Sequence, residues 1–72
     1  MDPRTECTPQ VRDHAEERRS DRGLATPDLV RLIRRGTWRA RADGLYDVVA
    51  GKWRIRIMVG RCTLWVETVM RR

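Results

Sequence analysis

Two helices are predicted in the first half of the chain from a shared set of start and stop signals. Thr8-Pro9 and Thr26-Pro27 each place a hydroxyl that caps a helix before a proline that favours the first turn. Gly23 and Gly36 then follow, and glycine is common just past a helix end. The predicted helices cover about residues 9–22 and 27–35.

The two predicted helices differ in how much apolar surface they carry. The second has Leu29, Leu32 and Ile33 on one side, which is typical of a helix that packs on a core. The first offers only Val11 and Ala15, so we expect it to lie at the edge of the core.

After Gly36 the apolar residues recur every second position, which indicates strands. Residues 45–50 follow an Asp43-Gly44 turn signal, and residues 52–59 and 62–70 both alternate. Segment 37–44 is compatible with a strand starting at Trp38 or with a loop whose indole caps the core.

These elements predict one α+β domain over residues 1–72, because a chain this short has no room for two domains. Two N-terminal helices would pack on one face of a three- to four-stranded antiparallel sheet. Residues 1–7 have no periodicity, and we expect a flexible tail or one poor strand there.

A two-residue turn at Gly60-Arg61 would fix the register of the last hairpin. The expected core-facing pairs are Val59–Cys62, Ile57–Leu64, Ile55–Val66 and Trp53–Thr68. The expected outward pairs are Arg56–Trp65, a cation–π contact, and Arg54–Glu67, a charge pair.

Charge is distributed unevenly. The chain carries 16 basic and 10 acidic residues, a net charge of +6. Residues 1–28 hold five Arg and seven acids, whereas residues 29–72 hold eleven basic residues and three acids. A GC-rich genome would explain the preference for Arg over Lys, but not the concentration of basic residues in residues 29–72. The positive charge of residues 29–72 therefore favours a polyanionic partner or an acidic protein partner.

The expected outward hairpin face combines Lys52, Arg54, Arg56 and Trp65. Cations beside a flat ring suit single-stranded nucleic acid, because they bind phosphates while the ring stacks on a base. The alternative is an ordinary solvated face in which the same pairs stabilise the hairpin.

His14, Arg18 and Arg22 are four residues apart, which places them on one stripe of the first predicted helix. The imidazole is suited to moving a proton, and the guanidiniums to neutralising a phosphorane, so the stripe fits phosphodiester chemistry. The alternative is a surface helix whose arginines pair with its own carboxylates at Asp13, Glu16 and Glu17.

Other compositional features exclude several classes of protein. No run approaches the roughly 18 apolar residues of a membrane span, and no secretory signal is recognisable. Cys7 and Cys62 are too few for a disulfide scaffold or a four-cysteine zinc site. We expect Cys7 to be a free thiol, Cys62 to be a small buried hydrophobe, and the protein to be reduced and cytoplasmic, without metal or cofactor.

The string HAEERRSDRGLATPDLVRLIRRG, residues 14–36, resembles the opening of small RelE/BrnT-like toxin domains. The later part is similar too, with Tyr46 in a strand and Thr68-Val69 near the end, followed by basic residues that include Arg71.

The resemblance implies an α+β fold, metal-independent RNA cleavage through attack of the internal 2′-hydroxyl, and neutralisation by a cognate antitoxin protein. The catalytic positions that it implies are His14, Arg18, Arg22, Tyr46 and Thr68. The RNA-binding set is Lys52, Arg54, Arg56, Trp65 and Arg71. We expect no membrane partner, and the sequence does not determine the oligomeric state.

Two other functions are compatible with the sequence. One is a winged helix-turn-helix, in which Arg31, Arg34 and Arg35 enter the DNA major groove and the hairpin is the wing. Arg19 argues against it, since it stands where that motif usually has a small residue. The other is a non-catalytic module that binds a protein through its basic face.

Overall fold

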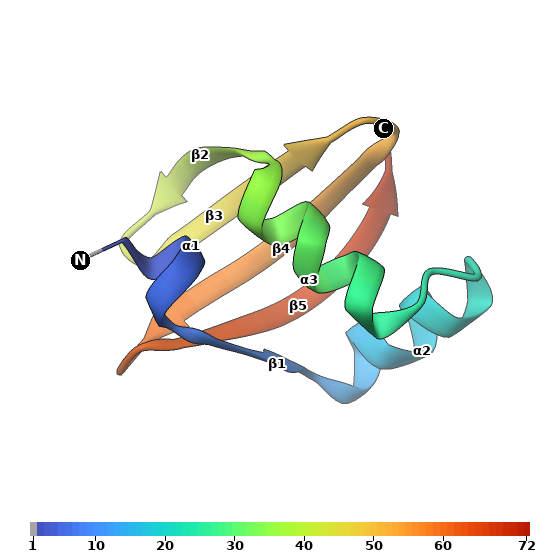
Figure 1. Ribbon diagram of the computed structural model, residues 1–72, viewed down its shortest axis with the longest axis horizontal. Helices are drawn as coiled ribbons and strands as arrows, with labels where there is room; N and C mark the ends of the chain where they lie inside the picture. Colours follow the sequence, from blue (N-terminus) through green and yellow to red (C-terminus); the bar gives the residue numbers. More distant parts are fainter. Residues whose placement is uncertain (1) are drawn as a thin grey trace.

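The computed structural model describes residues 2–72, which form an α+β fold with helices packed against a mixed sheet. The helices are α1 (Pro3–Glu6), α2 (Asp13–Asp21) and α3 (Thr26–Arg35). The strands are β1 (Thr8–Val11), β2 (Thr37–Ala42), β3 (Leu45–Ala50), β4 (Trp53–Gly60) and β5 (Thr63–Arg71). Figure 1 shows α3 crossing one face of the sheet, with α1 beside it and α2 beyond the end of β1.

The strand order is β1-β5-β4-β3-β2, and β1 is parallel to β5 while every other pair is antiparallel. The general α+β prediction is confirmed. Residues 37–42 pair with β3, so β2 to β5 make four antiparallel strands. The prediction of a purely antiparallel sheet with at most four strands is wrong, because residues 8–11 add a parallel edge strand.

The core lies between α3 and the sheet, as predicted from the apolar side of the second helix and the alternating apolar residues of the strands. Leu29 and Ile33 of α3 are fully buried, as are Ile55 and Ile57 of β4. Burial of a side chain of this size contributes about 1.5–3 kcal/mol. The remaining fully buried large side chains come from β3 and β5: Val48, Leu64, Val66 and Val69.

The predicted first helix over 9–22 is wrong at its start. The amide of Thr8 donates to the Cys62 carbonyl and that of Arg12 to the Val66 carbonyl, so this backbone belongs to the sheet. The helix α2 begins only at Asp13, because Arg12 still has an extended conformation. The Thr-Pro signal therefore does not decide the local structure where a neighbouring strand supplies hydrogen-bond partners.

Residues 1–7, for which a flexible tail or one poor strand is expected, contain a short helix in their described part. Residues 3–6 form α1, whose first turn is capped by the Asp2 carboxylate accepting from the Arg4 amide. Met1 lies outside the described residues. Cys7, which follows α1, is bonded to Cys62.

This disulfide corrects both expectations for the cysteines. Cys7 is not a free thiol, and Cys62 is exposed in a turn rather than buried as a small hydrophobe. The bond joins residues 55 apart in sequence. On the chain-entropy model, a loop of that length stabilises the fold by about 4 kcal/mol.

The β4–β5 hairpin turns one residue later than predicted. Arg61 and Cys62 occupy the turn with φ of 49° and 52°, and Gly60 pairs with Thr63. The observed facing pairs include Val59–Leu64 and Ile57–Val66.

A second shift follows, because the pairing skips Glu67, and Thr68 faces Arg56. The predicted pairing of Trp53 with Thr68 is therefore wrong, since Trp53 faces Arg71. The bulge moves the Thr68 side chain to the opposite face of the sheet from the one expected.

Among the described residues, no helix has the length and apolar character needed to cross a bilayer.

Gly36, at the end of α3, provides a sharp test of the packing between that helix and β3. A Cβ at this position would lie 2.5 Å from Cγ1 of Val48 and 2.9 Å from the Leu32 carbonyl oxygen. We expect Gly36→Ala to lower the free energy of unfolding by about 1–3 kcal/mol, because the helix and the strand must move apart. Urea denaturation measures the change.

Gly60→Ala is the matched control, since a Cβ at Gly60 meets nothing within 4 Å and its φ is not positive. The free energy of unfolding of that variant should lie within about 0.5 kcal/mol of that of the parent protein. Equal losses in the two variants would contradict the close approach at Gly36.

Candidate nucleic-acid interface

The face of the sheet opposite α1 and α3 carries most of the side chains that could bind a ligand, and we call it the outer face (Figure 1). Neighbouring residues across paired strands share a face, so the register defines its members. They include Arg39 and Arg41 from β2, Leu45, Asp47 and Val49 from β3, Arg54, Arg56 and Met58 from β4, Trp65, Glu67, Thr68 and Met70 from β5, and Arg12 just past β1.

Asp47 is a nearly buried carboxylate at the centre of the outer face, with only 5% of its side chain exposed. Arg56 Nε donates to its Oδ1 at 2.9 Å, and Arg41 Nη1 donates to its Oδ2 at 3.0 Å. Arg56 Nη2 also donates to Oδ2, at 3.4 Å. We call these three residues the Asp47 cluster.

Two opposing effects set the pKa of Asp47. Burial acts to raise it, but the hydrogen bonds and charges of Arg56 and Arg41 outweigh burial, so the pKa lies below its ordinary value. The bond to Asp47 in turn raises the pKa of Arg56. The carboxylate therefore stays ionised and holds two guanidiniums in fixed orientations.

An apolar row crosses the outer face beside the Asp47 cluster. Leu45, Met58 and Trp65 lie opposite one another on successive strands, and all three are half-buried. Their exposed parts form a shallow apolar strip flanked by arginines. Such a strip offers stacking and van der Waals contact to a flat ligand.

The partners of Trp65 and Glu67 differ from those predicted. Arg12, not Arg56, lies over the Trp65 ring, with its Cζ 4.6 Å from the ring centroid. Arg12 Nε also lies 2.9 Å from Glu67 Oε2, so the expected Arg54–Glu67 pair is replaced. The cause is the late turn and the bulge, which place Met58 opposite Trp65 and Met70 opposite Arg54.

Arg54 and Arg39 are exposed on the outer face, and neither makes an ion pair within residues 2–72. Since arginine carries its charge at every physiological pH, both are available to an anion. Arginines on this face outnumber the carboxylates Asp47 and Glu67, so it is positively charged.

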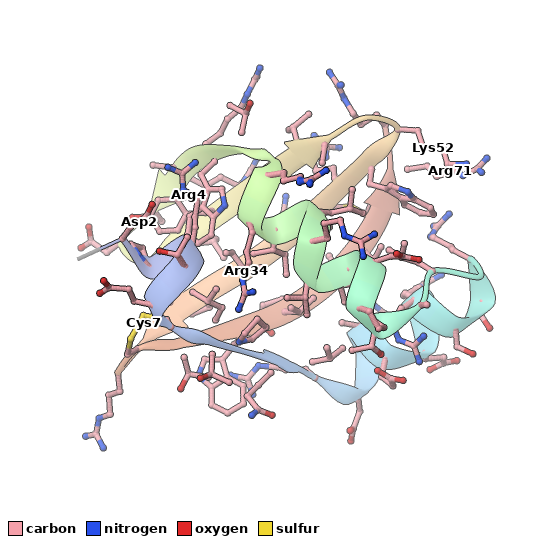
Figure 2. The ribbon with its side chains drawn as sticks, viewed as in Figure 1. Asp2, Arg4, Cys7, Arg34, Lys52 and Arg71 are labelled. Carbon is pink, nitrogen blue, oxygen red and sulfur yellow. A yellow bond between two sulfur atoms is a disulfide. The ribbon has the colours of Figure 1, made fainter. Side chains whose placement is uncertain are left out.

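Lys52 and Arg71 gather at the end of the sheet rather than on the outer face, as Figure 2 shows. Lys52 Nζ lies 5.5 Å and Arg71 Cζ 5.7 Å from the centroid of the Trp53 ring, which belongs to the core side. Arg72 Nη1 donates to the Gly51 carbonyl at the same end. The predicted RNA-binding residues thus fall into two neighbouring groups: Arg56 and Trp65 on the outer face, and Lys52 and Arg71 at the end of the sheet. Arg54, which follows Trp53 in β4, lies between the two groups.

His14, Arg18 and Arg22 are all exposed on or next to α2. His14 lies in the first turn, Arg18 in the last turn, and Arg22 is the C-cap residue. The carboxylate of Glu16 pairs with Arg19, which also donates to the Leu24 carbonyl. This ion pair within α2 therefore does not involve His14, Arg18 or Arg22.

The other two candidate catalytic residues lie on opposite faces of the sheet. Tyr46 faces Ile57 on the helix-covered side, with its ring centroid 5.2 Å from that of Trp38. Thr68 lies beside Arg56 on the outer face. The structure therefore does not bring Tyr46 and Thr68 onto one surface.

Within residues 2–72, no three or more His, Cys, Asp or Glu side chains gather as a metal ion would require.

No family model, curated protein or solved structure matches the chain.

Sequence reasoning missed Arg12, Arg41 and Asp47. A signal for Asp47 was present, because it is the only charged residue in the apolar strand LYDVVA. An acid at such a position needs a cationic partner. The positions of Arg12 and Arg41 depend on strands β1 and β2, which the sequence pattern left undefined.

Acid denaturation tests the Asp47 cluster. Because its pKa is lower in the folded than in the unfolded state, Asp47 contributes stability above its ordinary pKa of 3.8 that is lost as the pH falls further. Asp47→Asn should lower the unfolding free energy at pH 7 by about 1–3 kcal/mol, since both guanidiniums lose an ionic partner. Urea titrations between pH 7 and 2 measure both effects.

The unfolding free energy of Asp47→Asn should also depend less steeply on pH below 4 than that of the parent protein. Arg31→Ala serves as the control, because it breaks an exposed pair with Asp28 on α3 and should cost under 1 kcal/mol. Identical pH profiles for the parent and Asp47→Asn proteins would show that the carboxylate does not stabilise the fold.

Proposed function

We propose that the protein is an RNA-directed, toxin-like domain that binds single-stranded RNA across its outer face. The observation that carries this proposal is the Asp47 cluster beside the half-buried Trp65 and Met58. It combines oriented guanidiniums with an apolar strip on an open sheet, the two elements that single-stranded nucleic acid requires.

The Asp47 cluster leaves donors free for phosphate. A guanidinium has five N–H groups. Arg56 gives Nε and Nη2 donors to Asp47, and Arg41 gives one from Nη1. The remaining groups are held on half-exposed side chains, so binding a phosphate costs little further side-chain entropy.

Single strands fit this surface better than duplexes. The apolar strip accommodates the faces of unstacked bases, which a duplex keeps inside its stack. Arg54 continues the line of cations along β4 from Arg56 toward Lys52 and Arg71 at the sheet end. In this proposal the phosphates follow β4 while bases lie over Met58 and Trp65.

The finer assignment to the RelE-like fold belongs to the same proposal. The resemblance of residues 14–36 supports it, as does the order of a short strand, two helices and an antiparallel run of strands. It implies that a cognate antitoxin protein binds the domain. An acidic antitoxin segment and RNA would compete for the positive outer face.

RNA cleavage is the catalytic extension of the proposal. His14 would take the proton from a ribose 2′-hydroxyl, and the oxygen would attack the adjacent phosphorus while the P–O5′ bond breaks and the 5′-oxygen leaves, taking up a proton from water. Arg18 and Arg22, on the same helix stripe, would neutralise the added charge, and Thr68 would contact the substrate from the outer face. Tyr46 enters only through the resemblance, since it faces the helices.

The winged helix-turn-helix is supported less well. The β4–β5 hairpin lies inside the sheet, with β3 on one side and β1 on the other, so it does not project as a wing.

Incubation with labelled RNA in the presence of a chelator tests cleavage. The parent protein should produce fragments that end in 2′,3′-cyclic phosphate, and His14→Ala should cleave at least 100-fold more slowly, the range expected for loss of a general base. Glu17→Ala, on an exposed position of the same helix, is the control and should cleave at the parental rate. Equal rates for the parent and His14→Ala proteins would remove the imidazole from the mechanism.

The salt dependence of RNA affinity tests binding separately from cleavage. Arg54→Ala should weaken binding of a single-stranded oligonucleotide and reduce the slope of log K against log salt by about 0.7, the value for one lost phosphate contact. Arg34→Ala removes the same charge from α3, on the helix side, where Figure 2 labels this residue. It should leave the slope nearly unchanged, and equal effects of the two variants would reject the outer face as the site.

A further inference from the structure

The ring that should stack on RNA is covered in this structure. The Arg12 guanidinium lies 4.6 Å above the Trp65 centroid and is held there by Glu67 at 2.9 Å. A base cannot occupy the same face of the indole while Arg12 remains. The position of Arg12 thus decides whether this part of the outer face is open.

Arg12 is placed by β1, the shortest strand of the sheet. Its amide donates to the Val66 carbonyl directly after the four pairs between β1 and β5. Side chains of β1 add little to this anchoring, since Thr8 and Gln10 are exposed and Val11 is only half-buried. A strand with so little buried apolar surface has low local stability.

The disulfide fixes the start of β1 to the turn beside it. Cys7 immediately precedes the strand, Cys62 lies in the β4–β5 turn, and the Cys62 carbonyl accepts from the Thr8 amide. Figure 2 shows the bond at the corner where these segments meet.

We propose that the Cys7–Cys62 disulfide is a redox switch that masks Trp65 when oxidised and unmasks it when reduced. Reduction frees the start of β1, the strand leaves the edge of β5, and Arg12 leaves the indole. The regulatory role rests on the proposed function, because it concerns access of RNA to Trp65. The release of β1 is a separate structural step, which hydrogen exchange measures without RNA.

The reductant is a low-molecular-weight thiol. Its thiolate attacks Sγ of the exposed Cys62 and forms a mixed disulfide, while Cys7 leaves as a thiolate and takes up a proton. A second thiolate attacks the donor sulfur of that mixed disulfide, and Cys62 leaves and is protonated. Two thiols of the donor become one disulfide, and the protein gains two electrons and two protons.

RNA binding in the two redox states tests the switch. Fluorescence anisotropy with a labelled single-stranded oligonucleotide, with and without dithiothreitol, should show affinity on the order of tenfold higher after reduction, the gain expected from one stacked base. Equal or weaker binding by the reduced protein would overturn the switch. Absence of binding in both states would overturn the proposed function and the regulatory role with it.

Arg12→Ala separates masking from other effects of reduction and retains the disulfide. The oxidised variant should bind about as tightly as the reduced parent and should respond little to dithiothreitol. Arg31→Ala loses the same charge and also breaks an ion pair, but on α3, so it should keep the full redox response. A full redox response in Arg12→Ala would reject masking by this guanidinium.

Hydrogen exchange tests the structural step without RNA. Amides of residues 8–12 should exchange faster after reduction, whereas those of β3 and β4 should keep their protection. Unchanged exchange over residues 8–12, or loss of protection throughout the sheet, would overturn the local release of β1.

Discussion

The pairing of β4 with β5 decides which side chains this small sheet presents to solvent. Successive residues of a strand point to opposite faces, so any shift of one residue exchanges the two sets. The bulge at Glu67 places Thr68 beside Arg56 on the outer face and keeps Val69 fully buried under the helices. Without the bulge, the core would contain a hydroxyl and the outer face a valine.

Stability and proposed binding depend on the same ionic residues. A buried carboxylate such as Asp47 is costly unless cations satisfy it, and Arg41 and Arg56 do so from two different strands. The cluster therefore ties β2, β3 and β4 together on the side without α1 and α3. It also fixes guanidiniums that would otherwise sample many conformations, which is what a phosphate-binding surface needs.

The edge of the sheet is held in another way. A 72-residue chain buries only about 60% of the surface of its unfolded state, so its core stabilises distant segments weakly. β1 contributes few buried side chains, and the covalent bond from Cys7 to Cys62 offsets that deficit. The edge strand next to Trp65 is thus held in part by a covalent bond rather than by buried side chains.

Local sequence patterns predicted the elements that depend on local periodicity. The apolar stripe of α3 and the alternation of β4 were both correct, because each repeats within a few residues and faces one core. Asp47 was visible as an acid in an apolar strand, but its partners were not.

Contacts between distant residues decided the rest. The Thr8-Pro9 signal predicted a helix, yet the carbonyls of Cys62 and Val66 draw this segment into a parallel strand. The disulfide, the late turn and the bulge likewise depend on residues far apart in the chain. The sequence by itself determined the α+β class, the buried face of α3 and the excess of positive charge. Only the tertiary structure decided which arginines meet Asp47 and which one covers Trp65, because those contacts require strands that pair across the whole chain.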